Sequence, residues 1–206
     1  MGISNYTIIG CPSYYKYFDG KYPQINQSGV ENSVMSCTPS SVNETKIFEI
    51  GMKSNAIYIK QTEKEILGFE DNDNIAEMLP GMEESMYEEV YHYNEQAKLF
   101  FSIEEWNNFY ENNNISFAFG TRFHGNMEAL RNGVPALWIT HDSRTSELIE
   151  TLHLPHISLK KANNVSDVNE LYELCDMQSV YSTYRELCEK YVDFLNENGV
   201  QHKFSL

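Results

Sequence analysis

Residues 116–140 read SFAFGTRFHGNMEALRNGVPALWIT. The apolar and aromatic run Ser116–Phe119 has the length and composition of a buried strand. A helix is expected over Phe123–Asn132, because a glycine and a proline follow it as C-terminal signals. Ala136–Thr140 is then a second buried strand. The stretch therefore predicts strand, helix and strand in succession, which is the repeating unit of a parallel sheet.

Similar β-prone runs alternate with helical patterns along the rest of the chain. We therefore expect an α/β fold with a mainly parallel sheet and helices on both faces. Further strands are expected at Tyr6–Gly10, Ser33–Cys37, Ala56–Lys60, Lys98–Ser102 and His156–Leu159. Further helices are expected from Pro39 to a glycine stop at Gly51, from a capping box at Ser102 to the asparagines at 112–114, from Ser143 to about Leu152, and over Ser179–Asn196. Residues 68–96 are acidic and predict mixed helix and loop, or an insertion.

The composition excludes several classes of protein. A chain of 206 residues with 41% hydrophobic and 13% aromatic residues can bury a sizeable core and is not a disordered chain. A net charge of −15 argues against nucleic acid as a partner. The apolar stretches fall short of the roughly 20 residues that a transmembrane helix needs. Because the N-terminus carries no secretion signal, we expect a cytoplasmic protein.

Neither a metal site nor a nucleotide loop is indicated. The four cysteines, Cys11, Cys37, Cys175 and Cys188, form no Cys-x-x-Cys pair, so we expect buried or idle thiols. The histidines are scattered over separate elements, and we expect no metal. Glycine-rich phosphate loops of the P-loop and dinucleotide types are both absent from the sequence.

The charges are distributed unevenly along the chain. Residues 63–111 hold fourteen acidic residues against two lysines, whereas residues 112–161 carry a net charge of +1 and four of the six histidines. In an acidic protein, this second block is where an anion could bind. Charge alone does not separate such a site from a less acidic surface. Two of its histidines, His153 and His156, we interpret as structural.

The turn after the strand at 116–119 is the first candidate site. Thr121–Gly125 would lie at the carboxyl edge of the sheet and at the amino end of a helix, where open α/β sheets bind ligands. Arg122 adds a fork of donors suited to phosphate or carboxylate, and unpaired helix N–H groups lie beside it. His124 follows closely enough to contact the same anion or to transfer a proton.

The turn after the next strand is the second candidate site. If the two strands are neighbours, His141, Asp142, Ser143 and Arg144 share a rim with the first turn. Structural interpretations exist for several residues of this turn and helix: Asp142 or Ser143 could only cap a helix, Glu147 could only complement its dipole, and His141 could be a buried histidine. The two turns together still favour an anion site.

The motifs resemble those of the polysaccharide pyruvyl transferase family. The blocks Gly120–Ala136 and His141–Glu147 are similar to its most distinctive motif pair. Gly10–Ser13 after the first strand, a strand ending in Gln61, and Trp106 in a Glu-Trp step are also similar to the family pattern.

The resemblance implies a Rossmann-like domain, similar to the C-terminal half of a two-domain GT-B fold, that spans residues 1–206. The N-terminal half of such a fold is not in the sequence, so we expect either that domain or a second copy as a partner. The resemblance also implies transfer of an enolpyruvyl group from phosphoenolpyruvate to sugar hydroxyls of a lipid-linked or polymeric saccharide, as in cell-surface polysaccharide biosynthesis, without a cofactor. His124 and Arg122 would be catalytic. The substrate-binding residues would be Thr121, Gly125, Asn126, His141, Asp142, Ser143, Arg144 and Glu147.

Two other functions remain open from the residues. A glycosyltransferase could bind a nucleotide-sugar with the same arginine and helix end. A half-domain without activity could serve as a binding module, in which case an apolar face would be exposed.

Overall fold

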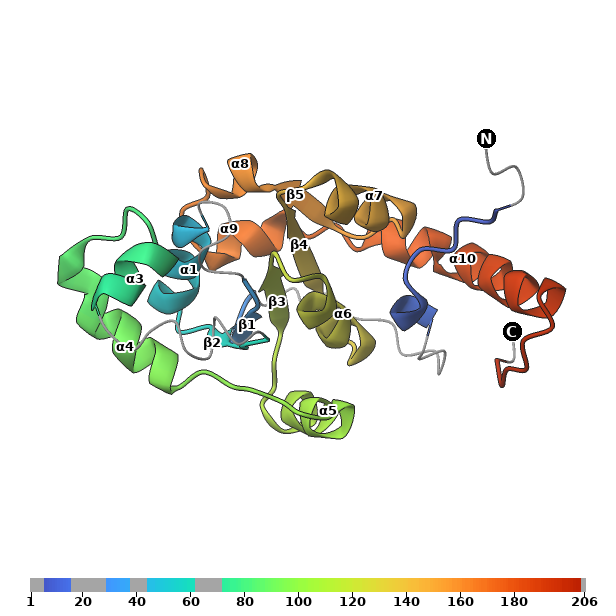
Figure 1. The fold of residues 1–206 in the computed structure, drawn as a ribbon, viewed down its shortest axis with the longest axis horizontal. Coiled ribbons are helices and arrows are strands. Elements are labelled where there is room, and N and C mark those ends of the chain that lie inside the picture. Colours follow the sequence, from blue (N-terminus) through green and yellow to red (C-terminus); the bar gives the residue numbers. More distant parts are fainter. Residues whose placement is uncertain (1–5, 16–28, 38–43, 62–71, 205–206) are drawn as a thin grey trace.

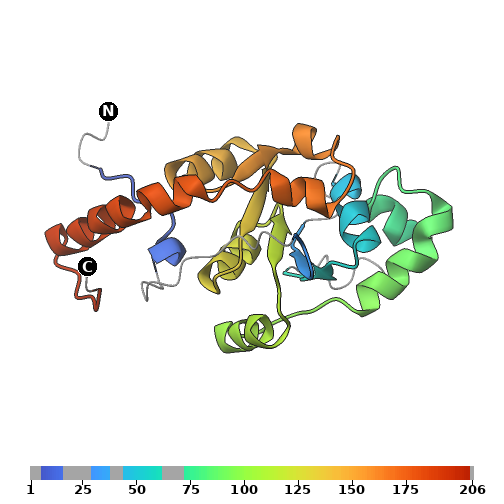
Figure 2. The same ribbon diagram turned by 180° about the vertical axis from the view of Figure 1, so that it is seen from behind.

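The computed structural model describes residues 6–15, 29–37, 44–61 and 72–204, and these contain one five-stranded sheet. Its parallel strands are β1 (Ser33–Met35), β2 (Ile57–Tyr58), β3 (Phe117–Gly120), β4 (Ala136–Thr140) and β5 (His156–Ser158). Helices lie on both sides of this sheet (Figures 1 and 2). The α/β, Rossmann-like fold expected from the sequence is thereby confirmed.

The helices confirm most of the expected segments. They are α1 (Thr45–Lys53), α3 (Asn72–Met78), α4 (Tyr87–Glu95), α5 (Ile103–Asn112), α6 (Phe123–Arg131), α7 (Ser143–Thr151), α8 (Leu159–Ala162), α9 (Val168–Glu173) and α10 (Gln178–Glu197), with short 3-10 turns η1 (Pro12–Tyr15) and η2 (Glu84–Met86). The helices expected at α5, α6, α7 and α10 are confirmed, and the Ser102 hydroxyl caps α5 by accepting from the Glu105 N–H at 3.2 Å. The acidic segment is helix and loop over 72–96, as expected, and residues 68–71 lie outside the described part.

The strand order is β2-β1-β3-β4-β5, so the chain adds β2 on one side of β1 and β3 on the other. A reversal of this kind opens a crevice between β1 and β3 at their carboxyl ends, and ligands of open α/β sheets bind there. The residues that follow β1, β2, β3 and β4 all meet at this edge. The topology thus brings together four segments that are far apart in the sequence.

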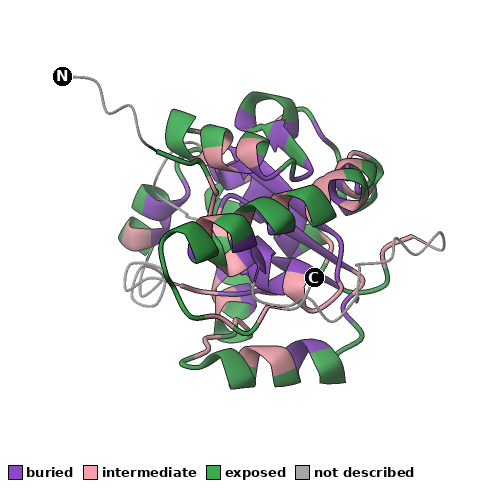
Figure 3. Ribbon diagram, turned by 90° about the vertical axis from the view of Figure 1, so that its right-hand side faces the viewer, coloured by how far each residue is buried: buried purple, intermediate pink, exposed green. Residues whose placement is uncertain are grey.

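The two faces of the sheet are covered by different helices. On one face, Tyr172 of α9 packs edge-on against Phe117 of β3, with ring centroids 5.2 Å apart. On the other, the indole N–H of the fully buried Trp138 donates to the carbonyl of Phe123 at the start of α6. Figure 3 shows the strands buried between the exposed outer faces of the helices. The packing fixes the position of α6 against the sheet.

The N-terminal segment is held by the long helix α10. Tyr15 of η1 stacks on Tyr191 of α10 with centroids 4.3 Å apart, and Tyr14 packs edge-on against Tyr184. In Figure 1 this segment and α10 lie side by side at one end of the molecule. The packing of η1 on α10 places Cys11, just before η1, near His124 at the start of α6.

Two of the expected strands are wrong. Tyr6–Gly10 forms no strand: its apolar side chains Tyr6 and Ile8 are exposed, and the Ile9 carbonyl accepts from the Tyr15 hydroxyl at 2.6 Å instead of from a neighbouring strand. In the segment Lys98–Ser102, Lys98 makes only an isolated bridge to Ile59. Phe100 packs on Trp106 of α5, so this apolar run serves the adjacent helix and not the sheet.

The glycine stop expected at Gly51 is also wrong, because Gly51 lies inside α1. A Cβ atom at this position would clash with the Met35 sulfur of β1. The glycine therefore permits close packing of α1 on the sheet and does not end the helix. The expected start of this helix, over 39–43, lies outside the described residues.

Candidate functional site

A cavity of about 390 Å³ opens at the carboxyl edge of the sheet. Its walls come from the end of β2, from the turn between β3 and α6, and from the turn between β4 and α7. The lining residues are Gln61, Thr121, Arg122, Phe123, His124, His141, Asp142, Arg144, Thr145 and Leu148. The two turns meet because β3 and β4 pair directly, with Gly120 opposite Trp138.

The β3–α6 turn is pressed tightly against β1. Gly120 has a φ of +141°, and a Cβ atom there would clash with the carbonyl oxygen of Ser36, which accepts from the Arg122 N–H at 3.1 Å. Gly125 is likewise buried, against the side chains of Ser36 and Gln61. Arg122 stands at the N-cap of α6 without a side-chain cap, so the first N–H groups of α6 are available to an anion.

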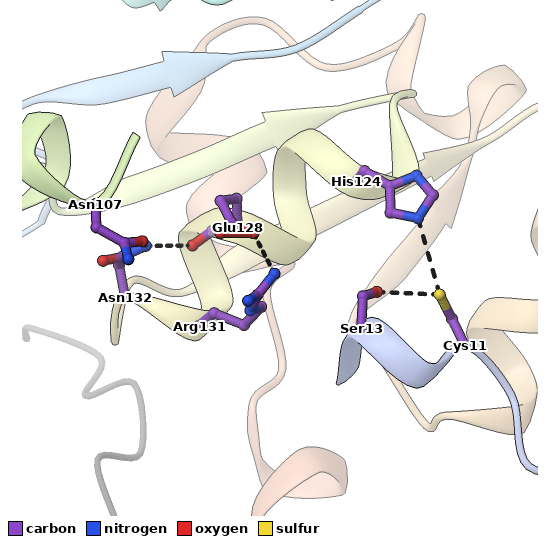
Figure 4. Close-up of polar contacts among 7 residues, drawn as sticks. All are labelled: Cys11, Ser13, Asn107, His124, Glu128, Arg131 and Asn132. Atoms are coloured by element: carbon purple, nitrogen blue, oxygen red, sulfur yellow. Dashed lines mark hydrogen bonds and ion pairs between the residues drawn. The ribbon is translucent and has the colours of Figure 1, made fainter. Parts of the chain in front are cut away.

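Arg122 and His124 both line the cavity from this turn. Partial burial lowers the pKa of His124, and the positive charge of Arg131 lowers it further. The imidazole is therefore neutral near pH 7. Its Nε2 lies 3.8 Å from the Sγ of Cys11, and Figure 4 draws this contact as a dashed line. The ring nitrogen therefore lies within hydrogen-bonding reach of the thiol.

The β4–α7 turn contributes His141, Asp142 and Arg144 to the same cavity. Asp142 caps α7, accepting from the Thr145 N–H at 2.6 Å and from its hydroxyl at 3.1 Å. The Thr145 N–H lowers the pKa of Asp142, assisted by the Thr145 hydroxyl, His141 and Arg144. The His141 Nε2 lies 3.2 Å from Asp142 Oδ2. The helix-capping interpretation of Asp142 is therefore confirmed, and Arg144 is the cation that this turn offers a ligand.

Thr121 lines the cavity, whereas Asn126 does not. Thr121 is buried, and its hydroxyl donates to Oε2 of the buried Glu44 at 2.8 Å. The buried Asn126 amide donates to the carbonyls of Gly120 at 2.9 Å and Leu137 at 3.1 Å, which ties β3 to β4. Asn126 does not line the cavity, so the structure gives this residue a structural role. Its substrate-binding role stays a prediction.

Ser143 and Glu147 also lie outside the lining. Both are exposed on α7, and their predicted contacts with substrate have no support from this geometry. His153 and His156, which we interpret as structural, are absent from the lining too. His156 Nδ1 lies 2.9 Å from the Leu154 carbonyl oxygen.

Several residues of the site were not expected from the sequence. Ser36 and Gln61 could have been found by the rule that the residues after parallel strands share one edge. Thr145 could have been found from its position beside Arg144 on the first turn of a helix. Glu44 has no local signal, because only the tertiary packing buries its carboxylate against the β3–α6 turn. Of the cysteines expected to be buried or idle, Cys37, Cys175 and Cys188 are buried, whereas Cys11 is half-buried beside His124.

We predict that Cys11 is the one cysteine that alkylates in the native protein. Cys37, Cys175 and Cys188 are buried, and burial raises the pKa of both Cys175 and Cys188 to about 12. The Cys11 thiol is partly exposed, with the Ser13 hydroxyl at 3.0 Å. Iodoacetamide labelling followed by mass spectrometry should give one adduct, and Cys11→Ser should give none. A second adduct under native conditions would contradict this arrangement of the thiols.

Two features of the described residues bear on other functions. Within these residues, no three His, Cys, Asp or Glu side chains gather as a metal ion would require. No helix of the described ranges combines the length and the apolar character needed to cross a membrane.

Comparison with known proteins identifies a family that the chain matches. A family model described as polysaccharide pyruvyl transferase matches residues 1–143. The matched span contains β1 to β4, α6 and the whole β3–α6 turn, and it ends at Ser143, before Arg144 and Glu147. No curated protein matches the sequence. The expectation that the chain is one half of a GT-B architecture stays a prediction.

Proposed function

The chain belongs to the polysaccharide pyruvyl transferase family, and from this premise we propose that it binds phosphoenolpyruvate and transfers its pyruvate unit to a saccharide. The observation that carries the proposal is the convergence of Arg122, His124 and Arg144 on one cavity at the carboxyl edge of the sheet. In a protein with a net charge of −15, such a local gathering of cationic and neutral donors favours an anionic ligand.

The donor site follows from the charges of phosphoenolpyruvate. Its phosphate suits the guanidinium of Arg122 and the uncapped N-terminus of α6, because both present N–H donors to an anion. Arg144 of α7 lines the same cavity and adds a second positive charge. Both groups would stabilise negative charge on the phosphate as it leaves.

The chemistry assigned to His124 is proton transfer. Protonation of the methylene carbon of phosphoenolpyruvate creates a cationic centre at C2, which a sugar hydroxyl attacks. Loss of inorganic phosphate and attack by a second hydroxyl then close the pyruvate ketal. The imidazole is neutral in the free protein, and a bound anion next to it favours its protonated form. His124 is thus suited to supply the first proton.

The remaining parts of the reaction would come from partners. The acceptor is a saccharide, lipid-linked or polymeric, whose hydroxyls enter from the open side of the cavity. An N-terminal domain or a second copy of the chain would cover that side. The reaction as written involves no redox change and requires no metal or cofactor.

The test is a thermal-shift titration with phosphoenolpyruvate. At about 100 times its dissociation constant, a ligand adds roughly 2.7 kcal/mol, or about 5 to 11 °C for a chain of this size. Arg122→Ala should abolish the shift. Arg185→Ala is the matched control, because Arg185 is exposed on α10 and paired only with Glu189 among the ion pairs described. The control should respond as the wild type does.

The other outcomes would contradict the proposal. A shift with a uridine or guanosine diphosphate sugar, but none with phosphoenolpyruvate, would favour a glycosyltransferase. The absence of a shift with either ligand would favour a binding module.

A further inference from the structure

Ser36 has a buried hydroxyl group with no hydrogen-bond partner. The residue directly follows β1 in the crevice between β1 and β3, and its exposed fraction is 2%. Its Oγ is completely buried and makes no hydrogen bond. Most buried hydroxyl groups are hydrogen-bonded, because leaving one unpaired costs free energy. Ser36 lies at the edge of the sheet where a ligand is expected, so its unpaired hydroxyl suggests that it gains a hydrogen-bond partner when the ligand binds.

The surroundings of the hydroxyl connect it to the cavity. The backbone of Ser36 is fully engaged, since its N–H donates to the Phe119 carbonyl and its carbonyl accepts from the Arg122 N–H. Its side chain lies against Gly125 in the first turn of α6. A Cβ atom on Gly125 would come closer than 3.0 Å to both the Ser36 Oγ and the Gln61 Nε2. The hydroxyl and the amide therefore both lie beside Gly125 of α6, and Gln61 also lines the cavity.

The amide of Gln61 can join the hydroxyl to a ligand. A side-chain amide has one carbonyl oxygen that accepts and one NH₂ group that donates, and its terminal torsion is soft. A half-turn of this amide would bring Oε1 to the position near Ser36 and Gly125 that Nε2 occupies, and would turn the NH₂ group toward a ligand in the cavity that Gln61 lines. The Ser36 hydroxyl then donates to Oε1, and Gln61 Nε2 donates to a bound anion. Such a rotation satisfies the buried hydroxyl.

We propose that Gln61, oriented by Ser36, binds the carboxylate of the donor. The proposal rests on the proposed function, in which Arg122 and the α6 N-terminus take the phosphate. Gln61 comes from the end of β2, on the opposite side of the crevice from Arg122, so the two residues hold opposite ends of a small dianion. Gln61 is the binding residue and Ser36 is a positioning residue.

The experiment is calorimetric titration with two ligands. One is phosphoenolpyruvate and the other is inorganic phosphate, which has no carboxylate. Gln61→Ala should weaken phosphoenolpyruvate binding by about tenfold or more, the usual value of a hydrogen bond to a charged group, and leave phosphate binding within about twofold. Gln61→Glu keeps an acceptor for Ser36 but loses the donor, so its loss should be at least as large.

Ser36→Ala separates the positioning role from a structural one. It should weaken phosphoenolpyruvate binding by roughly threefold to tenfold, since the Gln61 amide loses its orienting partner. Without ligand, its melting temperature should equal or exceed that of the wild type, because an unpaired buried hydroxyl is removed. A lower melting temperature with unchanged affinity would overturn the positioning role.

The outcomes distinguish the two proposals. If the Gln61 variants lose both ligands equally, or keep both while Arg122→Ala loses phosphoenolpyruvate, the carboxylate assignment is overturned and the proposed function stands. If the wild type binds phosphate but not phosphoenolpyruvate, both the proposed function and this inference are overturned.

Discussion

Arg131→Met is expected to lower the free energy of unfolding by about 3 to 5 kcal/mol. Arg131 forms an ion pair with Glu128, one turn earlier on α6, and both side chains are only 7% exposed. Figure 4 shows this pair on the same helix as His124. Removing the arginine leaves the Glu128 carboxylate buried without its ion-pair partner, which costs more than the pair itself contributes. The melting temperature should fall by roughly 6 to 20 °C.

The double variant Glu128→Leu/Arg131→Met is the control. Replacing both members of a buried pair by apolar side chains is often neutral. We therefore expect the double variant to recover most of the lost stability. Urea unfolding of the wild type, both single variants and the double variant gives the coupling energy directly. A double variant that is less stable than Arg131→Met would contradict this account of the pair.

Among substitutions that add a single methyl group in the site, Gly120→Ala is expected to lower the free energy of unfolding most. Two penalties combine: the φ of +141° strains any residue with a Cβ atom, and that atom clashes with the Ser36 carbonyl oxygen of β1. A strained backbone costs about 1 to 3 kcal/mol, and overpacking costs a similar amount. Because the clash is with backbone, the neighbour cannot move aside without disturbing β1. We expect a loss of roughly 3 to 5 kcal/mol in urea unfolding.

Gly133→Ala is the matched control for this substitution. Gly133 also has a positive φ, +79°, but no atom lies within 4 Å of the position of its Cβ. It therefore isolates the backbone strain, and its loss should be about 1 kcal/mol. Equal losses for the two alanine variants would show that the contact with Ser36 does not constrain the turn.

Both predictions concern the stability of the structure around the proposed donor site. The ion pair lies on α6, the helix whose first turn lines the cavity, and Gly120 sets the direction in which that helix leaves β3. Partial loss of stability in either variant should therefore reduce ligand binding as well. The effect is indirect, since neither residue lines the cavity.

The sequence by itself determined the elements with strong local signals. The apolar runs predict β3 and β4, and the glycine turn before α6 together with Gly133 and Pro135 after it predicts that helix. The capping box at Ser102 predicts α5. The convergence of Arg122 and His124 with His141 and Arg144 also follows, because residues after adjacent parallel strands must share one edge. These features depend on residues within about ten positions of one another and on one topological rule.

An apolar run or a glycine can have more than one structural role, and its local sequence does not distinguish between them. The runs at 6–10 and 98–102 have the composition of strands, but the first associates with Tyr15 of η1 and the second packs on α5. Gly51 has the sequence context of a helix stop and is a packing residue against Met35. Composition alone does not determine against which part of the protein an apolar segment packs.

Only the tertiary structure decided the inner part of the site. Glu44 meets Thr121 across 77 residues, Cys11 meets His124 across 113, and Ser36, Gln61 and Gly125 converge from three separate elements. Each contact depends on how tightly α1, η1 and α6 pack on the sheet, which is the sum of many weak interactions between distant residues. The chemistry of a buried hydroxyl or carboxylate depends on its partners, and the fold brings those partners together.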